Sequence, residues 1–292
     1  MSSDKVFTFC NYVFLSICLL VVLIPLINIV SQSISHPADV YAGKVILWPT
    51  RLSMAGYRRI WNNDDIISGF GNSIIITFSG TLISLFLTVI AAYPLSRKDL
   101  LGRGAIMWLF TFTMLFNAGL IPTYLQIQSL GLIDTRWSLI LINALSAWNV
   151  IIARTFFMHT IPEELYDAAN IDGCSDISTM MRIVLPLSKP ILAILVLFYA
   201  VGIWNSYFDA MIFLQTQGKY PLQLVLRNIM TSAQLQANIM GAAAGADHGL
   251  RLAETDVMKY AVIVFSSLPL LLLYPFIQRH FVKGLMIGAV KG

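Results

Sequence analysis

Long apolar runs separated by short polar segments dominate this chain. The runs lie near residues 10–30, 72–95, 105–125, 137–157, 191–214 and 258–278. Each has about the 20 residues that cross a bilayer as a helix, and none shows the alternation of membrane β-strands. The pattern predicts an all-α integral membrane protein with six transmembrane helices and both termini on one side. The first run is too long for a signal peptide and lacks a cleavage pattern, so we expect it to remain as a span.

Composition supports a lipid environment. Hydrophobic residues make up 57% of the chain and charged residues 12%, and the mean hydropathy is +0.75. These values exclude an ordinary soluble domain. Anionic lipid headgroups account for the net charge of +4, so the charge requires no nucleic-acid partner. We see no internal repeat and expect one transmembrane domain over residues 1–292.

Basic residues indicate the orientation of the predicted spans. Alternate loops place ten Lys and Arg residues on the side of the termini and nine on the other, so the total is uninformative. Three of them, Arg97, Lys98 and Arg103, crowd the short loop 96–104. Short loops rich in Lys and Arg stay in the cytoplasm. We therefore expect this loop, the loop 159–190 and both termini to be cytoplasmic.

The polar loop between the fourth and fifth runs predicts two short helices. Thr160-Ile-Pro-Glu163 has the spacing of a capping box, which predicts a helix start. Gly173 is the residue type that ends a helix in a left-handed turn. Ser175 or Asp176 is expected to cap a second helix that Pro186 stops.

The first of these helices has the character of a surface helix that docks into a partner. Its apolar stripe consists of Leu165, Ala168, Ala169 and Ile171. The acidic residues around this stripe are Glu163, Glu164, Asp167 and Asp172. A protein that binds this helix would move spans four and five, because both are tied to the loop. The alternative is an amphipathic connector lying on the membrane surface.

The same loop resembles a known motif. The loop contains Asp167-Ala168-Ala169, then Gly173 after three residues, and then Ile183-x-Leu185-Pro186 after nine more. This spacing is similar to the EAA-x3-G-x9-I-x-LP loop of permease subunits of binding-protein-dependent ABC importers. Asp167 departs from the usual Glu. Segments outside the loop resemble the carbohydrate branch of that family, namely Asn72-Ser73, residues 92–97, Trp204-Asn205 and residues 283–292.

The resemblance implies a fold, a function and a set of partners. The fold is the type I ABC importer permease fold, and the chain is similar to the maltose-type second permease and to the subgroup for polysaccharide fragments. Expected partners are a second homologous permease, a cytoplasmic ATPase dimer that uses ATP and Mg, an extracytoplasmic solute-binding protein and an oligosaccharide. The expected location is the bacterial cytoplasmic membrane. The residues implied in ATPase coupling are Glu164, Asp167, Ala168, Ala169, Gly173, Ile183, Leu185 and Pro186.

The resemblance also implies a role for the long loop 215–257. In the family, the corresponding loop probes the sugar site of the docked binding protein. Its Gly/Ala-rich centre at 241–249 is expected to be flexible, with a disordered surface loop as the alternative.

Catalytic motifs are missing from the sequence. No G-x-x-x-x-G-K-[ST] phosphate loop occurs, and no Ser/His/Asp set, carboxylate pair or metal-ligand cluster stands out. We therefore expect no enzyme activity and no cofactor or metal bound by this chain.

Polar and aromatic residues within the runs are candidates for a sugar pathway. Amides and carboxylates bind hydroxyl groups, and aromatic rings bind the C–H faces of sugars. The candidates are Asn143, Trp148, Asn149, Asn205, Tyr207 and Asp209, with Asn117, Tyr124 and Gln128 around the third run. Each has a structural alternative, as an interhelical hydrogen bond or an interfacial aromatic residue. Asp209 stands out because a carboxylate in a span is costly, and we expect Asn205 on the same helical face, one turn earlier.

Other classes of function remain as alternatives. An ion-coupled secondary transporter would place charged relays in the spans and often shows repeats. A membrane enzyme or receptor would need a catalytic group or a signalling domain. An ABC permease for a non-sugar solute would share the loop but should lack the tail GLMIGAVKG.

Overall fold

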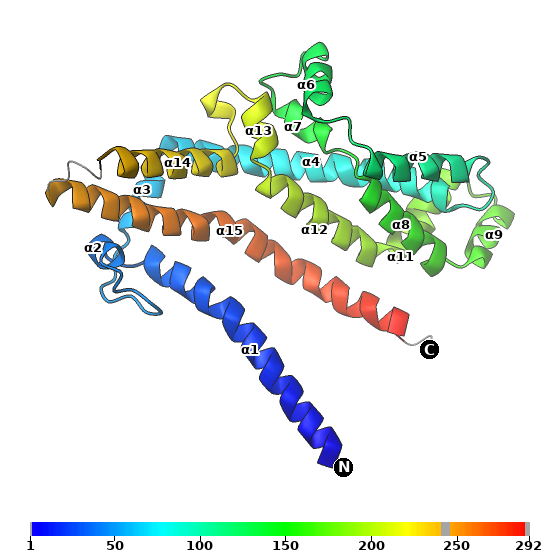
Figure 1. Cartoon of the computed structure of the whole chain (residues 1–292). Coiled ribbons are helices and arrows are strands. Elements are labelled where there is room, and N and C mark those ends of the chain that lie inside the picture. Colours follow the sequence, from blue (N-terminus) through cyan, green and yellow to red (C-terminus); the bar gives the residue numbers. More distant parts are fainter. Residues whose placement is uncertain (1, 241–245, 290–292) are drawn as a thin grey trace. The chain divides into compact units, whose positions relative to one another are not determined.

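The computed structural model describes residues 2–240 and 246–289 (Figure 1). The α-helices are α1 (Ser2–Ser33), α2 (Pro37–Tyr41), α3 (Ala55–Trp61), α4 (Asp64–Ser96), α5 (Arg103–Leu115), α6 (Leu120–Ser129), α7 (Arg136–Ile142), α8 (Ala147–Thr160), α9 (Glu163–Ile171), α10 (Asp176–Thr179), α11 (Leu185–Leu187), α12 (Lys189–Asn205), α13 (Phe208–Phe213), α14 (Leu222–Met240) and α15 (Ala246–Ala289). A π-helix, η1 (Met180–Val184), and a 3-10 helix, η2 (Gln217–Lys219), complete the described elements. The predicted all-α class is confirmed.

Three helices are long and apolar enough to cross a membrane without a break. They cover Asp4–Ser33, Asp64–Ser96 and Ala253–Pro275. Three more candidate spans are bent helix pairs: α5 with α6 at 114°, α7 with α8 at 49°, and Asp176–Leu187 with Lys189–Asn205 at 83°. If each pair is one span, the described residues contain the six spans that the sequence predicts.

The third span is not the straight helix predicted over 105–125. α5 ends at Leu115 and α6 begins at Leu120. Between them, Gly119 has a φ of +84°, and its N–H donates to Asn117 Oδ1 at 2.9 Å. Glycine adopts this backbone conformation without steric cost, so the chain turns here.

The segment 215–257 also differs from the predicted long loop. α14 occupies Leu222–Met240, and α15 begins at Ala246. Leu222, Val225 and Leu226 are buried, with the i, i+3, i+4 spacing of an amphipathic helix. The predicted flexible centre at 241–249 lies partly outside the described residues, which omit 241–245.

The chain divides into two compact units, residues 1–67 with 225–268 and residues 68–224 with 269–292. In the first unit, α3 packs tightly on α15, because a Cβ at Gly56 would lie 2.8 Å from the Cβ of Ala261. Asp39 accepts from the Arg51 Nε and Nη2 at 2.8 Å each and from Thr50 Oγ1 at 2.8 Å. These bonds, led by Arg51, hold the pKa of Asp39 below its usual range.

In the second unit, α4 packs against α12 along small and hydroxyl-bearing residues. A Cβ at Gly80 would lie 2.8 Å from Ile203 Cδ1, so the end of the Ile203 side chain packs directly over this glycine. Thr88 Oγ1 and the Tyr199 hydroxyl are 2.6 Å apart. Such residues let helices approach closely in lipid and satisfy polar groups between them. Figure 1 shows α8, α9 and α11 gathered at one end of this unit.

Asp134 ties together two loops of the second unit. Its carboxylate accepts from the backbone N–H of Gln215 at 3.0 Å, from the N–H of Thr216 at 2.9 Å and from Lys219 Nζ at 2.7 Å. These donors, led by Lys219, hold the pKa of Asp134 below its usual range. Asp134 has a φ of +57°, a conformation that Asp and Asn tolerate better than most residues. The carboxylate therefore anchors the segment after α13.

We expect Asp134→Asn to loosen that segment without disturbing the backbone turn, because Asn accepts the positive φ but is a weaker acceptor than a carboxylate. Amide hydrogen exchange over residues 214–219 should become about tenfold faster, as measured by mass spectrometry. Asp99→Asn, which removes the carboxylate bonded to Arg97, is the control and should leave this peptide unchanged. Unchanged exchange in Asp134→Asn would contradict the anchoring role.

Candidate functional site

The polar loop folds as two short helices joined at a glycine. α9 ends at Ile171, and Gly173 follows with a φ of +72°. The N–H of Gly173 donates to the carbonyl of Asn170 at 3.1 Å, and the N–H of Cys174 donates to the carbonyl of Ala169 at 2.9 Å. This pair of bonds is a Schellman cap. The predicted helix–glycine–helix order of the loop is confirmed.

Two local predictions for this loop are wrong. Thr160 does not cap α9, because it is the last residue of α8, and Pro162 occupies the N-cap position without a side-chain bond. Pro186 does not stop the second helix, which continues to Leu187. Pro186 lies in the first turn of α11 after the π-helix, where a missing N–H leaves no intrahelical bond unmade. Of the two predicted caps, Ser175 forms the bond, accepting from the N–H of Ser178 at 3.3 Å.

α9 presents one face to the chain and another to its surroundings. Tyr166 and Ala169 are buried, at 7% and 3% exposed, and Leu165 is half-buried. The exposed face carries Glu164, Asp167, Ala168 and Ile171, and Ile171 is 86% exposed. The predicted apolar stripe is therefore divided, since Leu165 and Ala169 pack inward while Ala168 and Ile171 point outward.

The remaining motif residues lie along the second helix. Ile183 and Leu185 are half-buried, and Pro186 is exposed. Leu185 lines an apolar cavity of about 590 Å³ between this helix and α4. Val184, which the motif does not include, is fully buried and fixes η1 to the core.

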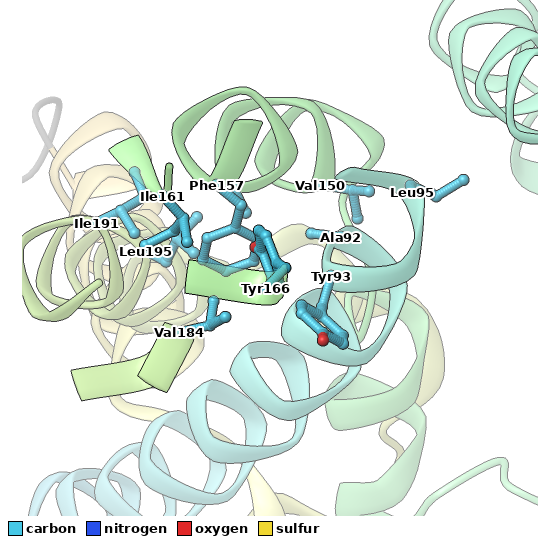
Figure 2. Packing of buried hydrophobic residues seen from close by; sticks show 11 residues of the cluster. Ala92, Tyr93, Leu95, Val150, Phe157, Ile161, Tyr166, Val184, Ile191 and Leu195 are labelled. Carbon is cyan, nitrogen blue, oxygen red and sulfur yellow. The ribbon is translucent and has the colours of Figure 1, made fainter. Parts of the chain in front are cut away.

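A buried cluster holds α9 against the end of α4 (Figure 2). It joins side chains from α4, α8, α9, η1 and α12, namely Ala92, Tyr93, Leu95, Val150, Ala153, Phe157, Ile161, Tyr166, Val184, Ile191 and Leu195. Arg97 covers this cluster, with its guanidinium carbon 4.0 Å from the centre of the Tyr166 ring. Burial raises the pKa of the Tyr166 hydroxyl. α9 is thus fastened to α4 as well as to the helices on either side of the loop.

Two further polar contacts join the same elements. Lys98 pairs with Glu163 in an exposed ion pair. Arg154 Nε on α8 donates to the carbonyl of Leu95 at 2.8 Å, which satisfies a carbonyl at the end of α4. The basic loop 96–104 and the motif loop therefore form one surface.

Two of the predicted pathway residues come together in the structure. Asn143, at the C-terminal end of α7, donates through Nδ2 to Asp209 Oδ2 at 3.0 Å. Ser206 Oγ donates to the same carboxylate oxygen at 3.1 Å. Ser206 was not predicted, although a serine three residues before an acidic residue is a common spacing at helix starts. Asn143, Ser206 and Asp209 form the polar cluster of this unit.

Asn205 does not share a helical face with Asp209, as the sequence had suggested. α12 ends at Asn205 and α13 begins at Phe208, so the chain breaks between the two residues. Asn205 Nδ2 instead donates to the carbonyl of Val201 in its own helix at 2.9 Å. The i, i+4 relation requires a continuous helix, which the sequence alone did not exclude.

The other pathway candidates are scattered. Trp148 and Tyr207 are exposed, at 58% and 41%, whereas Asn149 is buried at 6%. Asn117 bonds at the α5–α6 break, and Tyr124 stacks on Phe213 with ring centres 6.1 Å apart. Gln128 is exposed on α6.

The family model for the inner membrane component of binding-protein-dependent transport systems matches residues 2–287. The chain belongs to this family. The family resemblance inferred from the EAA-type loop is therefore confirmed.

Relatives of this permease match over nearly its whole length. It is 42% identical over 99% of both chains to the polygalacturonan/rhamnogalacturonan transport system permease protein YtcP of Bacillus subtilis (strain 168). It is 40% identical to Protein LplC of the same organism, covering 99% of this chain and 96% of that protein. A chain in the crystal structure of a bacterial ABC transporter involved in import of the acidic polysaccharide alginate aligns with a TM-score of 0.83, at 34% identity over 96% of this chain and 98% of that chain. This likeness confirms the importer permease fold.

We expect Ala169→Asp to destabilise the permease, since it places an unpaired carboxylate at a position that is only 3% exposed, at a cost of roughly 2 kcal/mol or more. The thermal unfolding midpoint in detergent should fall by about 5 °C or more. Ala168→Asp is the matched control, because its side chain points outward and its midpoint should stay within about 1 °C of the parent. Equal losses in both variants would contradict the assigned inward face of α9.

Proposed function

We propose that this permease is the transmembrane subunit of an ATP-driven oligosaccharide importer. With a second homologous permease it forms the translocation pathway, and an extracytoplasmic solute-binding protein delivers the sugar. A cytoplasmic ATPase dimer, using ATP and Mg, binds the motif loops of both permeases and drives alternating access. The helices move as rigid bodies in this cycle. The chain lies in the bacterial cytoplasmic membrane with the motif loop and both termini in the cytoplasm.

The observation that carries this proposal is the free face of α9. Glu164, Asp167, Ala168 and Ile171 are exposed, while the opposite face is fixed to the protein by Tyr166 and Ala169. An isolated nine-residue helix is unstable in water, so a docked one with an exposed Ile171 is a preformed ligand for a groove. A helix held in this way passes the motion of its partner to the spans.

We further propose that the substrate is an acidic oligosaccharide. The descriptions of two similar proteins mention acidic polysaccharides: polygalacturonan/rhamnogalacturonan for one and alginate for the other. In this chain, a pocket of about 450 Å³ at the end of the unit away from α9 contains Arg136, Trp137 and Lys219, beside Ser79 and Asp134. Arg136 donates one hydrogen bond to Asn72 Oδ1 at 2.7 Å.

The chemistry of this pocket suits a uronate. A guanidinium has five N–H donors in a fork that matches a carboxylate. Lys219 is already paired with Asp134, so Arg136 supplies the net positive charge. The ring of Trp137, which is 52% exposed, offers an apolar face to a sugar ring. The volume falls in the range of small-molecule sites.

Replacing Ala168 by Asp should weaken the ATPase contact, because it adds a charge to the free face of α9. Affinity purification of the permease from native membranes in gentle detergent, followed by quantitative mass spectrometry, should recover the second permease and a P-loop ATPase with the parent chain. The ATPase should fall about tenfold with Ala168→Asp while the second permease is retained. Asn170→Asp adds the same charge to the flank of α9 and should retain both partners.

Two outcomes of this purification would overturn the proposal. Recovery of the parent chain as a homo-oligomer alone would favour a secondary transporter. Equal ATPase recovery from the parent chain and from Ala168→Asp would remove the coupling role of α9.

Arg136→Gln should reduce uptake of trigalacturonate by cells about tenfold, because a charge-assisted hydrogen bond to the carboxylate is lost. Uptake of the methyl-esterified trisaccharide, which has no free carboxylate, should change less than twofold in the same variant. Arg136→Lys retains the charge and should give an intermediate rate. Equal loss of both substrates would assign Arg136 to structure, through Asn72, and contradict the acidic-sugar pocket.

A further inference from the structure

We infer that α4 carries the motion of the motif loop to the polar cluster of Asn143 and Asp209, and that Arg97 and Tyr166 form the joint at its end. This inference rests on the proposed function, since it concerns how the ATPase is coupled to the pathway. α4 is the second span, and it is not connected in sequence to the motif loop. Arg97 and Tyr166 are positioning residues in this scheme, because neither is placed near the substrate.

The joint between α9 and α4 is mostly buried. The Arg97 guanidinium lies over the Tyr166 ring at 4.0 Å, and the Arg97 side chain is only 18% exposed. A cation over an aromatic ring is held more strongly when water is excluded. The parallel contact between Lys98 and Glu163 is exposed on both sides, so solvent and salt weaken it. Arg97 and Tyr166 therefore carry most of the directional contact.

The second helix of the loop makes a looser contact with α4. The apolar cavity of about 590 Å³ lies between them, lined by Tyr93 and Leu85 on one side and Ile177 and Met181 on the other. Helices separated by a cavity lack partner atoms across it, so along this stretch the second helix is tied to the buried cluster mainly through Val184. Within the loop, α9 contacts the end of α4 both through the buried cluster and through the Arg97–Tyr166 contact.

α4 offers an unbroken route away from the loop that is independent of the chain connection through α8. It is one unbroken helix from Asp64 to Ser96. On one side of the loop, an 83° bend separates Leu187 from Lys189; on the other, α8 is unbroken and its 49° bend with α7 lies at its far end. A displacement applied at a continuous helix is preserved along it, whereas breaks in the hydrogen-bond ladder absorb displacement.

Hydroxyl groups in the middle of α4 connect this helix to the polar cluster. Thr88 Oγ1 lies 2.6 Å from the Tyr199 hydroxyl, which accepts from the backbone N–H of Ser146 at 3.2 Å. Ser84 Oγ donates to the carbonyl of Asn143 at 3.3 Å. Both bonds end at the α7–α8 break, and Asn143 in turn bonds Asp209. Movement of α4 therefore repositions Asn143 and Asp209, two of the pathway candidates from the sequence.

The test uses the complex purified from native membranes and a substrate-independent readout. The three cysteines of the chain are replaced by Ser, and Tyr207 is replaced by Cys. The rate at which a thiol reagent labels this new cysteine reports how accessible the region next to Asp209 is. In the parent background, ATP with Mg should change this rate about tenfold. Arg97→Gln and Tyr166→Leu should each reduce the change to less than about twofold while ATP hydrolysis continues.

Matched variants separate the joint from general damage. Tyr166→Phe keeps the aromatic ring and should retain the ATP response, and Lys98→Gln should retain it because that ion pair is exposed. The Arg97→Gln/Tyr166→Leu double variant should be no worse than either single one, since both remove the same contact.

Other outcomes would overturn the inference. A full ATP response in Arg97→Gln, or losses that add in the double variant, would exclude the joint. Either result would indicate that the coupling runs through α8 and α12 instead. Arg97→Gln is the deciding variant if Tyr166→Leu does not accumulate. Absence of any ATP response or ATPase in the parent complex would instead refute the proposed function itself.

Discussion

The packing of Tyr166 into the buried cluster at the end of α4, with Ala169 buried on the same face of α9, determines how the motif loop can act. A nine-residue helix has too few hydrogen bonds to be stable alone, so its orientation comes from the side chains it buries. Burial of this face leaves the acidic and apolar residues of the opposite face in solvent. The same packing connects α9 to helices from three different parts of the chain. A helix fixed on one side and free on the other is suited to transmit force.

Lipid imposes a second constraint on the transmembrane part. Polar groups in a bilayer must find partners inside the protein, so each hydroxyl and amide in a span constrains how the helices pack. On α4, Ser84 and Thr88 meet this requirement by bonding across to α7 and α12, and Gly80 allows Ile203 to approach. The polar groups that join the spans thus lie along the helix that also contacts the motif loop.

Several features could be predicted because they depend on neighbouring residues in sequence. The helix over 163–171, the glycine turn at Gly173 and the cap at Ser175 follow from local backbone preferences. The cost of a lone carboxylate in a span indicates that Asp209 needs a polar partner, but Asn143, 66 residues earlier, is identified as that partner only by the tertiary structure. The capping box at Thr160 failed because α8 extends one turn further than its apolar pattern indicates. The helix of α14 was missed because its polar residues resembled those of a loop, although Leu222, Val225 and Leu226 already carried the helical spacing.

The sequence by itself determined the membrane class, the all-α fold, the family and the position of the motif loop, since apolar run length and motif spacing are properties of the linear chain. The tertiary structure alone decided which face of α9 is free, where α5, α7 and α12 end, and that Ser206 rather than Asn205 joins Asp209. These features depend on which residues from distant segments fill a given space. A helix boundary or an exposed face reflects a small difference between competing contacts, and those contacts exist only once the chain is folded.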